Sequence, residues 1–166
     1  MNPLAERLAT AVSSGDLLES SRDNILSLLG ASTDPLYLTS IEQLLEGAEW
    51  AELNDRFFRQ LAFGTGGMRA RTIGRVVTEA ENGSPSDIGR PEHPAVGTNN
   101  LNFYNLSRAT QGLVRYLKTF HEKEGLSEKP SLAIAHDTRH FSRGYAEIVA
   151  KVAAENGCAV HLIDLP

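Results

Sequence analysis

The chain has 166 residues, of which 41% are hydrophobic, and its 21 acidic and 16 basic side chains give a net charge of −5. This length suffices for one domain with a substantial core, and the acidic balance argues against nonspecific nucleic-acid binding, which needs a basic face. A single cysteine excludes an intrachain disulfide, and no apolar run approaches the ~20 residues of a membrane span. We therefore expect a cytoplasmic protein with no nucleic-acid or membrane partner.

The first sixty residues have the apolar spacing of helices. After a short first helix, the pattern predicts a second over residues 16–29, with Gly30 as its stop. Residues 39–42, Thr-Ser-Ile-Glu, fit a capping box and predict the start of a third helix, in which Gly47 marks a break.

The composition changes at Phe63, where glycines and arginines are concentrated in FGTGGMRARTIGRVV. Ile73, Val76 and Val77 predict a strand after the glycines. Glycines, prolines and few apolar residues predict a long loop over 79–97, and loops of this length are usually functional or disordered.

The last third of the chain predicts a helix followed by a strand–helix–strand unit. Apolar residues at helical spacing between 106 and 120 predict the first of these helices, which ends at Gly125. A strand over 132–135, a polar loop, a helix capped by Ser142 and a strand over 158–163 follow, and the two strands should be parallel.

The first candidate site consists of Gly64, Thr65, Gly66, Gly67 and Arg69. Glycines let backbone N–H groups approach an anion closely, a threonine adds a hydroxyl donor, and the planar guanidinium fork matches phosphate oxygens. This combination suits phosphate or a phosphoester. The alternative is a glycine-rich turn with arginines merely on the surface, and the pattern alone leaves both interpretations open.

The second candidate site consists of Asp137, Arg139 and His140, with Ser142 beside them. It follows a predicted parallel strand, at the sheet edge where ligands bind in open α/β folds, and precedes a helix N-terminus that favours anions. The alternative is a connecting loop in which Asp137 pairs with Arg139 or the backbone and Ser142 only caps the helix. The histidine spacing offers no helical zinc pair and no carboxylate cluster accompanies it, so we expect no metal site within this chain.

Three segments, in this order, resemble the alpha-D-phosphohexomutase superfamily, which includes phosphoglucomutases and phosphomannomutases. LAFGTGGMRA resembles its F-G-T-[AS]-G-[LIM]-R-[AG] element, and GTNNLNFYNLSRATQGLVRYL resembles the helix that follows. LAIAHDTRHFSRGYAEIVAKVAAENGCAVHLID resembles the next strand, loop, helix and strand, with a D-[ST]-R-[HY]-x-S loop. The helical stretch leading into Asn54-Asp55-Arg56-Phe57 is most similar to the bacterial phosphoglucomutase/phosphomannomutase branch.

The resemblance implies a three-layer α/β/α domain with a mixed, partly parallel sheet over 61–166, preceded by an N-terminal helical extension over 1–60. It implies a parent enzyme that is an intramolecular phosphotransferase, interconverting sugar 1-phosphate and 6-phosphate through a phosphoserine and a bisphosphosugar intermediate. Such enzymes use Mg²⁺ and a glucose-1,6-bisphosphate-type activator. By resemblance, Thr65 and Arg69 lie beside the phosphoserine, while Arg139 and His140 support the same cleft.

Several family motifs are absent from these 166 residues: the serine loop T-A-S-H-N-P, the magnesium loop D-G-D-x-D-R and the sugar-selecting G-E-x-[ST] element. We therefore expect an N-terminal portion, truncated before the phosphoserine loop and inactive alone. Its partners would be a phosphosugar, the remaining domains of the parent chain and, through an unfinished sheet edge, a second copy. Two alternatives stay open: a stand-alone phosphate- or sugar-phosphate-binding module, and a helical interaction domain.

Overall fold

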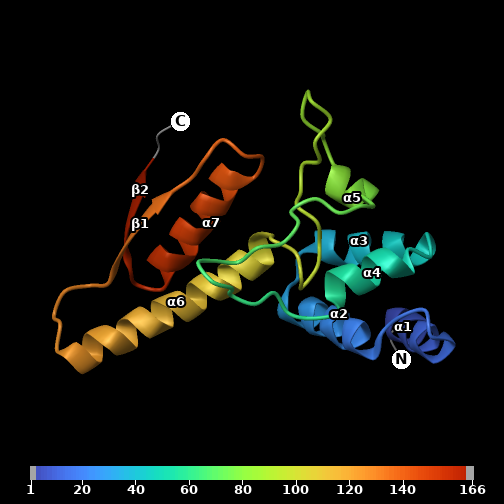
Figure 1. The fold of residues 1–166 in the computed structure, drawn as a ribbon, viewed down its shortest axis with the longest axis horizontal. Coiled ribbons are helices and arrows are strands. Elements are labelled where there is room, and N and C mark those ends of the chain that lie inside the picture. Colours follow the sequence, from blue (N-terminus) through green and yellow to red (C-terminus); the bar gives the residue numbers. More distant parts are fainter. Residues whose placement is uncertain (1–2, 164–166) are drawn as a thin grey trace. The chain divides into compact units, whose positions relative to one another are not determined.

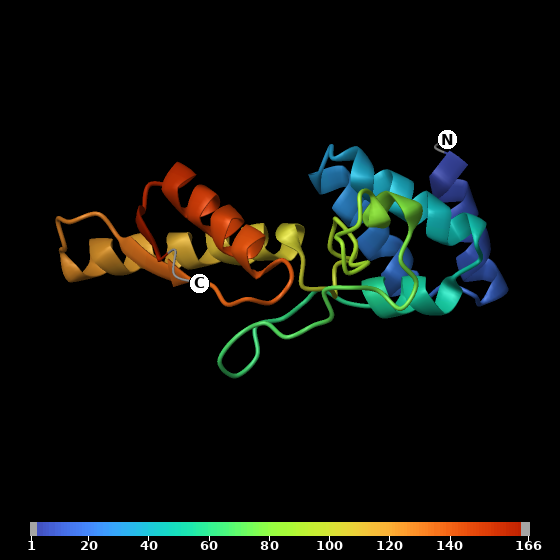
Figure 2. The same ribbon diagram turned by 90° about the horizontal axis from the view of Figure 1, so that it is seen from above.

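The computed structural model describes residues 3–163, and the chain divides into two compact units, Met1–Asn102 and Phe103–Pro166. The described residues form seven helices and two strands, shown in Figures 1 and 2. In chain order these are α1 Pro3–Ser14, α2 Glu19–Ala31, α3 Pro35–Glu46, α4 Trp50–Phe57, α5 Glu79–Asn82, α6 Phe103–Glu124, β1 Ser131–Ala135, α7 Ser142–Glu155 and β2 Ala159–Ile163.

The first unit is built on the four helices α1–α4, each of which buries one apolar face. Burial of these faces is the main favourable term in its folding, because apolar area leaves water. The apolar side chains with the least exposure come from all four helices: Leu8, Ile25, Leu28, Ile41, Leu44, Leu53 and Phe57. The predicted helical extension is thus present, and Gly30, its predicted stop signal, is the penultimate residue of α2.

The third helix begins earlier than its sequence signal indicated. Asp34 is its N-cap, and the Asp34 carboxylate accepts a hydrogen bond from the backbone N–H of Leu36 at 3.0 Å. Pro35 occupies the first turn, where no N–H is needed. The capping box predicted at residues 39–42 is therefore wrong, because these residues lie inside α3. The break at Gly47 is confirmed, since this glycine ends α3.

Residues 58–102 contain little regular structure, and the strand predicted from Ile73, Val76 and Val77 does not form. The backbone of this segment bonds to other partners: the N–H of Ala95 donates to the carbonyl of Thr72 at 2.9 Å, and the carbonyl of Val76 accepts from a buried arginine. The stretch predicted as loop begins with the single helical turn α5. A capping box between Thr78 and Glu81 starts that turn.

The second unit is an α/β arrangement in which α7 connects two parallel strands. β1 and β2 pair in register from Ser131 with Ala159 to Ala135 with Ile163, which confirms the predicted parallel pairing. α6 and α7 pack on one another and on the strands around Val114, Ala153, Cys158, Leu132 and Val160. Gly125 and Gly157 follow α6 and α7 with φ of 65° and 87°, as a helix-ending glycine requires.

No helix within residues 3–163 combines the length and the apolar character that crossing a membrane would require.

Candidate functional site

The glycine-rich segment forms a tight two-residue turn in the first unit. The N–H of Gly64 donates to the carbonyl of Gly67 at 3.0 Å, and the N–H of Gly67 donates back at 3.3 Å. Gly66 has φ of 78° and Gly67 of 140°, values that an L-residue with a Cβ rarely adopts. Two of the N–H groups expected to meet an anion are therefore used inside the turn, which leaves those of Thr65 and Gly66 to face a ligand.

Residues 62–66, which lead into this turn and form most of it, are exposed. Figure 2 shows the green segment after α4 leaving the helices as a long loop. Arg69 is exposed and has no hydrogen bond or ion pair to any residue in the described range 3–163. Its guanidinium fork is thus available to phosphate oxygens. The hydroxyl of Thr65 is also exposed, four residues before Arg69.

The ends of this loop are fixed by backbone hydrogen bonds to residues 95–101. The N–H of Leu61 donates to the carbonyl of Thr98 at 2.7 Å, and the N–H of Leu101 donates to the carbonyl of Arg71 at 3.0 Å. The side chain of Arg71 forms an ion pair with Asp55 of α4. No local sequence pattern indicates this pair, because Arg71 and Asp55 are far apart in the chain.

The second candidate loop lies in the second unit, between β1 and α7. The Asp137 carboxylate accepts the backbone N–H of Arg139 at 3.0 Å and the Arg139 Nε at 2.7 Å. These contacts, led by the backbone N–H of Arg139 and aided by the side chains of Ser142 and Arg139, lower the pKa of Asp137. The pairing considered as the alternative interpretation of this loop is therefore present, although Arg139 stays exposed.

The helix after this loop begins without the predicted cap. Phe141, not Ser142, is the N-cap residue of α7, and no side chain caps the helix. The Ser142 hydroxyl instead accepts the backbone N–H of Asp137 at 3.2 Å, so the predicted capping role is wrong. Phe141 has φ of 64°, a left-handed conformation that costs energy in a non-glycine residue.

Aromatic side chains pack around the residues where the loop meets α7. The Phe141 ring lies 4.1 Å from the His140 imidazole and 5.9 Å from the Tyr145 ring, measured between centroids. Tyr145 also meets Phe103 edge to face at 5.3 Å. Burial raises the pKa of the Tyr145 phenol above its ordinary value. His140 is thus placed on an aromatic cluster next to the Asp137–Arg139 pair.

The two candidate loops belong to different units, with Gly64, Thr65, Gly66, Gly67 and Arg69 in the first and Asp137, Arg139 and His140 in the second. Their convergence on one cleft stays a prediction. Within residues 3–163, no three histidine, cysteine or carboxylate side chains are grouped so that they could hold a metal ion.

Comparison with known proteins gives a family for the second unit together with the last residues of the first unit. Residues 94–166 match the family described as phosphoglucomutase/phosphomannomutase, alpha/beta/alpha domain I. This segment belongs to the phosphohexomutase superfamily. The predicted fold class is thereby confirmed: an α/β/α domain I with parallel strands, preceded by helices. No solved structure matches the chain at a significant level.

Two curated phosphoglucomutases are similar to a large part of the chain. A phosphoglucomutase of Staphylococcus aureus (strain bovine RF122 / ET3-1) is 26% identical over 124 residues, which cover 75% of this chain and 17% of that protein. The phosphoglucomutase of strain USA300 is 26% identical over 113 residues, covering 68% of this chain and 15% of its own length. The chain thus spans about a sixth of the phosphohexomutases that it matches.

Proposed function

We propose that this chain is the N-terminal part of a phosphoglucomutase or phosphomannomutase, an intramolecular phosphotransferase that interconverts sugar 1-phosphate and 6-phosphate. The observation that carries the proposal is the match of residues 94–166 to domain I of that family. The exposed turn at Gly64–Gly67 supports it independently, because it offers unengaged N–H groups and a free guanidinium to an anion. A phosphosugar and the remaining domains of the parent enzyme are the proposed partners, and a cytoplasmic location is proposed with them.

Phosphoryl transfer depends mainly on alignment and on stabilisation of charge spread over the phosphoryl oxygens. In the proposed cycle the phosphoserine gives its phosphoryl group to a hydroxyl of the bound sugar phosphate, and the bisphosphosugar then returns its other phosphoryl group to the serine. Arg69 would bind oxygens of the transferred group, and the Thr65 N–H and hydroxyl would orient it. Arg139 would compensate charge in the cleft, because its guanidinium is fixed on one side by Asp137 and exposed on the other.

Mg²⁺ and a glucose-1,6-bisphosphate-type activator belong to the parent enzyme in this proposal. The grouped carboxylates that Mg²⁺ prefers are not found within residues 3–163, so its ligands would come from another part of the parent. When bound, the ion would neutralise charge on the phosphoryl oxygens. The residues of this chain act through hydrogen bonds and guanidinium charge instead.

Phosphate binding to the isolated chain tests the role of the glycine-rich turn. We expect inorganic phosphate and glucose 1-phosphate to shift the amide NMR signals of Thr65 and Gly66, and Arg69→Ala to weaken binding about tenfold, since a charge-assisted contact contributes roughly 1.5–3 kcal/mol. Arg75→Ala is the matched control, because Arg75 is an exposed arginine of the same unit outside the turn. Equal affinity of the wild type and the Arg69→Ala variant would contradict the proposal for this turn.

A stand-alone phosphate-binding module is the second candidate, because the turn presents its donors without help from any other domain. The encoding gene separates the two candidates. A reading frame that continues into a serine loop of the T-A-S-H-N-P type supports the mutase, whereas a stop codon after Pro166 combined with phosphate binding supports the module.

A further inference from the structure

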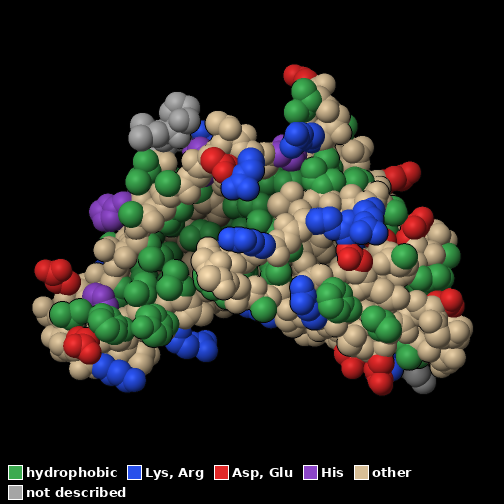
Figure 3. Space-filling model, in the orientation of Figure 1, with side chains coloured by type: hydrophobic (Ala, Val, Ile, Leu, Met, Phe, Trp, Pro, Cys, Tyr) green, Lys and Arg blue, Asp and Glu red, His purple; other side chains and the backbone are tan. Residues whose placement is uncertain are grey.

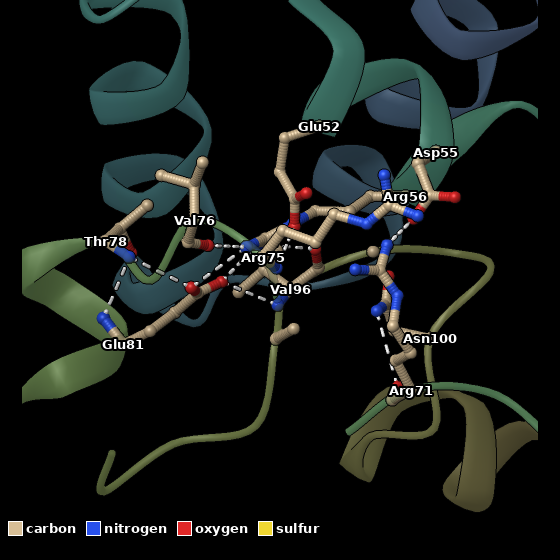
Figure 4. Close-up of polar contacts among 12 residues, drawn as sticks. Glu52, Asp55, Arg56, Arg71, Arg75, Val76, Thr78, Glu81, Val96 and Asn100 are labelled. Atoms are coloured by element: carbon tan, nitrogen blue, oxygen red, sulfur yellow. Dashed lines mark hydrogen bonds and ion pairs between the residues drawn. The ribbon is translucent and has the colours of Figure 1, made fainter. Parts of the chain in front are cut away.

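A fully buried guanidinium lies on α4, on the same helix face as the apolar core. The Arg56 side chain has 0% exposure, and its Nε donates to Glu52 Oε1 at 2.8 Å. Its Nη1 donates to Glu81 Oε1 at 2.5 Å, and Nη2 lies 3.3 Å from Glu81 Oε2. Both carboxylates are also buried. Figure 4 shows the polar contacts of the whole cluster. The Arg56 cluster consists of Arg56, Glu52 and Glu81.

Such a cluster is a weak source of stability by itself. Removing three charges from water opposes folding, and well-packed apolar residues of similar volume often stabilise a core equally well. The main effect of such a cluster is to fix the backbone groups that the charges bond to, because a fully satisfied polar network favours one geometry. Each charge of the Arg56 cluster meets backbone groups in addition to the opposite charge.

These backbone groups come from the two segments that follow the glycine-rich turn. The Arg56 guanidinium donates to the carbonyls of Val76, at 2.5 Å, and Val96, at 3.2 Å. Glu81 Oε1 accepts the N–H of Val96 at 2.8 Å, and Glu52 Oε1 accepts the N–H of Arg75 at 3.1 Å. The Arg56 cluster thus joins residues 75–81 and 96 to α4.

The same two segments carry the base of the glycine-rich loop. Thr98 holds the loop at Leu61, and the stretch from Ala95 to Leu101 holds it at residues 71 and 72. The carbonyl of Arg56 itself accepts the N–H of Asn99 at 2.9 Å. Between these attachment points the loop has one internal bridge, Gly64 to Gly67, so its orientation depends on the geometry of the base.

We propose that Arg56 is a positioning residue for the glycine-rich loop, its guanidinium acting through the backbone of Val76 and Val96. The inference rests on the proposed function where it concerns phosphate, and on geometry alone where it concerns the loop. Sequence reasoning missed Arg56, although an arginine on an apolar helix face, four residues after Glu52, was a readable signal of a buried pair.

Amide hydrogen exchange of the full chain tests this inference without any ligand. Arg56→Lys keeps the charge but loses the fork, and we expect exchange at the N–H groups of Leu61, Ala95 and Leu101 to increase at least tenfold relative to α1 and α2. Leu28→Ala is the control, because it weakens the same unit from a buried site on α2. If Arg56→Lys fails to fold, the isosteric Glu81→Gln variant replaces it.

The inference is supported if amide exchange becomes faster only at the loop base in Arg56→Lys and shows no such local increase in Leu28→Ala. The same uniform increase in both variants would overturn it, because Arg56 would then act only on global stability. A second experiment measures the binding of inorganic phosphate. We expect at least fivefold weaker binding to Arg56→Lys and unchanged binding to Leu28→Ala. A wild-type chain that binds no phosphate refutes the phosphate role of the turn, while the exchange result still decides the role of Arg56.

Discussion

Gly74 and Gly97 lie against the Arg56 cluster at points where a side chain has no room. A Cβ on Gly74 would lie 2.1 Å from Arg56 Nη2 and 2.6 Å from the carbonyl oxygen of Val76. A Cβ on Gly97 would lie 2.4 Å from Asn100 Oδ1 and 2.9 Å from the carbonyl oxygen of Arg56. Both glycines are therefore required by the close approach of other groups rather than by their own backbone conformation.

Gly97→Ala should lower the free energy of unfolding of the first unit by about 1–3 kcal/mol, because the contacting atoms belong partly to the backbone and cannot move aside cheaply. Gly30→Ala in α2 is the control: nothing lies within 4 Å of its added Cβ, and alanine is the better helix former, so it should be neutral or stabilise by up to about 1 kcal/mol. Urea unfolding followed by circular dichroism measures both. A neutral Gly97→Ala would mean that residues 95–101 are not held as tightly as described.

The lowered pKa of Asp137 gives a prediction for acid solution. Because the folded-state pKa lies below the ordinary value of 3.8, the Asp137–Arg139 contacts persist above that value and are lost as the pH falls through the lower folded-state pKa. Arg139→Ala should raise the pKa only in part, since the backbone N–H of residue 139 remains the main cause. An NMR titration of the Asp137 carboxyl carbon checks this, and an unchanged pKa in Arg139→Ala would show that the side-chain pair is not formed in solution.

At the scale of elements, α6 has a buried face and an exposed apolar face. Val114 is part of the core of the second unit, whereas Leu113, Tyr116 and Phe120 are exposed, and hydrophobic side chains are visible over α6 in Figure 3. Neighbouring residues of one helix therefore differ sharply in burial, as the helical period of 3.6 requires.

Val114→Ala should destabilise the second unit by about 1–3 kcal/mol, because it leaves a cavity between α6, α7 and the strands. Leu113→Ala removes more carbon atoms but from an exposed site, so its effect should stay within about 0.5 kcal/mol. Thermal unfolding of the two variants measures the difference. Equal losses would show that the exposed face of α6 is covered in solution.

Most elements could be predicted from the sequence, because their signals are local. The helix period, the glycines after α6 and α7 and the short apolar strands β1 and β2 are all readable within a few residues. The failures share a different cause. The segment around Val76 has the composition of a strand, but its carbonyl bonds to Arg56, twenty residues away, and no local pattern reports such a partner.

At the scale of the whole molecule, the sequence predicted a division after residue 60, whereas the chain separates into compact units at Asn102 and Phe103. The glycine-rich turn and residues 71–102 pack with the N-terminal helices because the Arg56 cluster and the backbone bonds of Thr98 and Leu101 tie them there. Hydropathy patterns do not show which charged residues, distant in the chain, pair in the interior, as Arg56 and Glu81 do. The extent of the first unit could therefore not be predicted. The predicted boundary between an N-terminal helical extension over 1–60 and a domain over 61–166 stays a prediction.

The serines of this chain bear on whether it has mutase activity by itself. Transfer to a sugar needs an exposed serine that alternates between phosphorylated and free forms. Ser13 and Ser14 bond to carbonyls of their own helix, Ser40 is buried against Glu81, and Ser142 accepts the N–H of Asp137. These hydroxyls are held by structural contacts, and none lies in a T-A-S-H-N-P context.

We therefore predict no conversion of glucose 1-phosphate to glucose 6-phosphate by the isolated chain, even with glucose 1,6-bisphosphate and Mg²⁺ present. A coupled dehydrogenase assay measures this, with a complete phosphoglucomutase as positive control and incubation without protein as background. Intact-mass analysis after exposure to the bisphosphate adds a second readout, since a phosphoryl acceptor would gain one phosphate. Turnover above background would contradict the prediction and show that a residue of this chain acts as the phosphoryl acceptor. A phosphate-binding turn without an acceptor binds its ligand and releases it unchanged, so phosphate affinity should persist in the same preparation that shows no turnover.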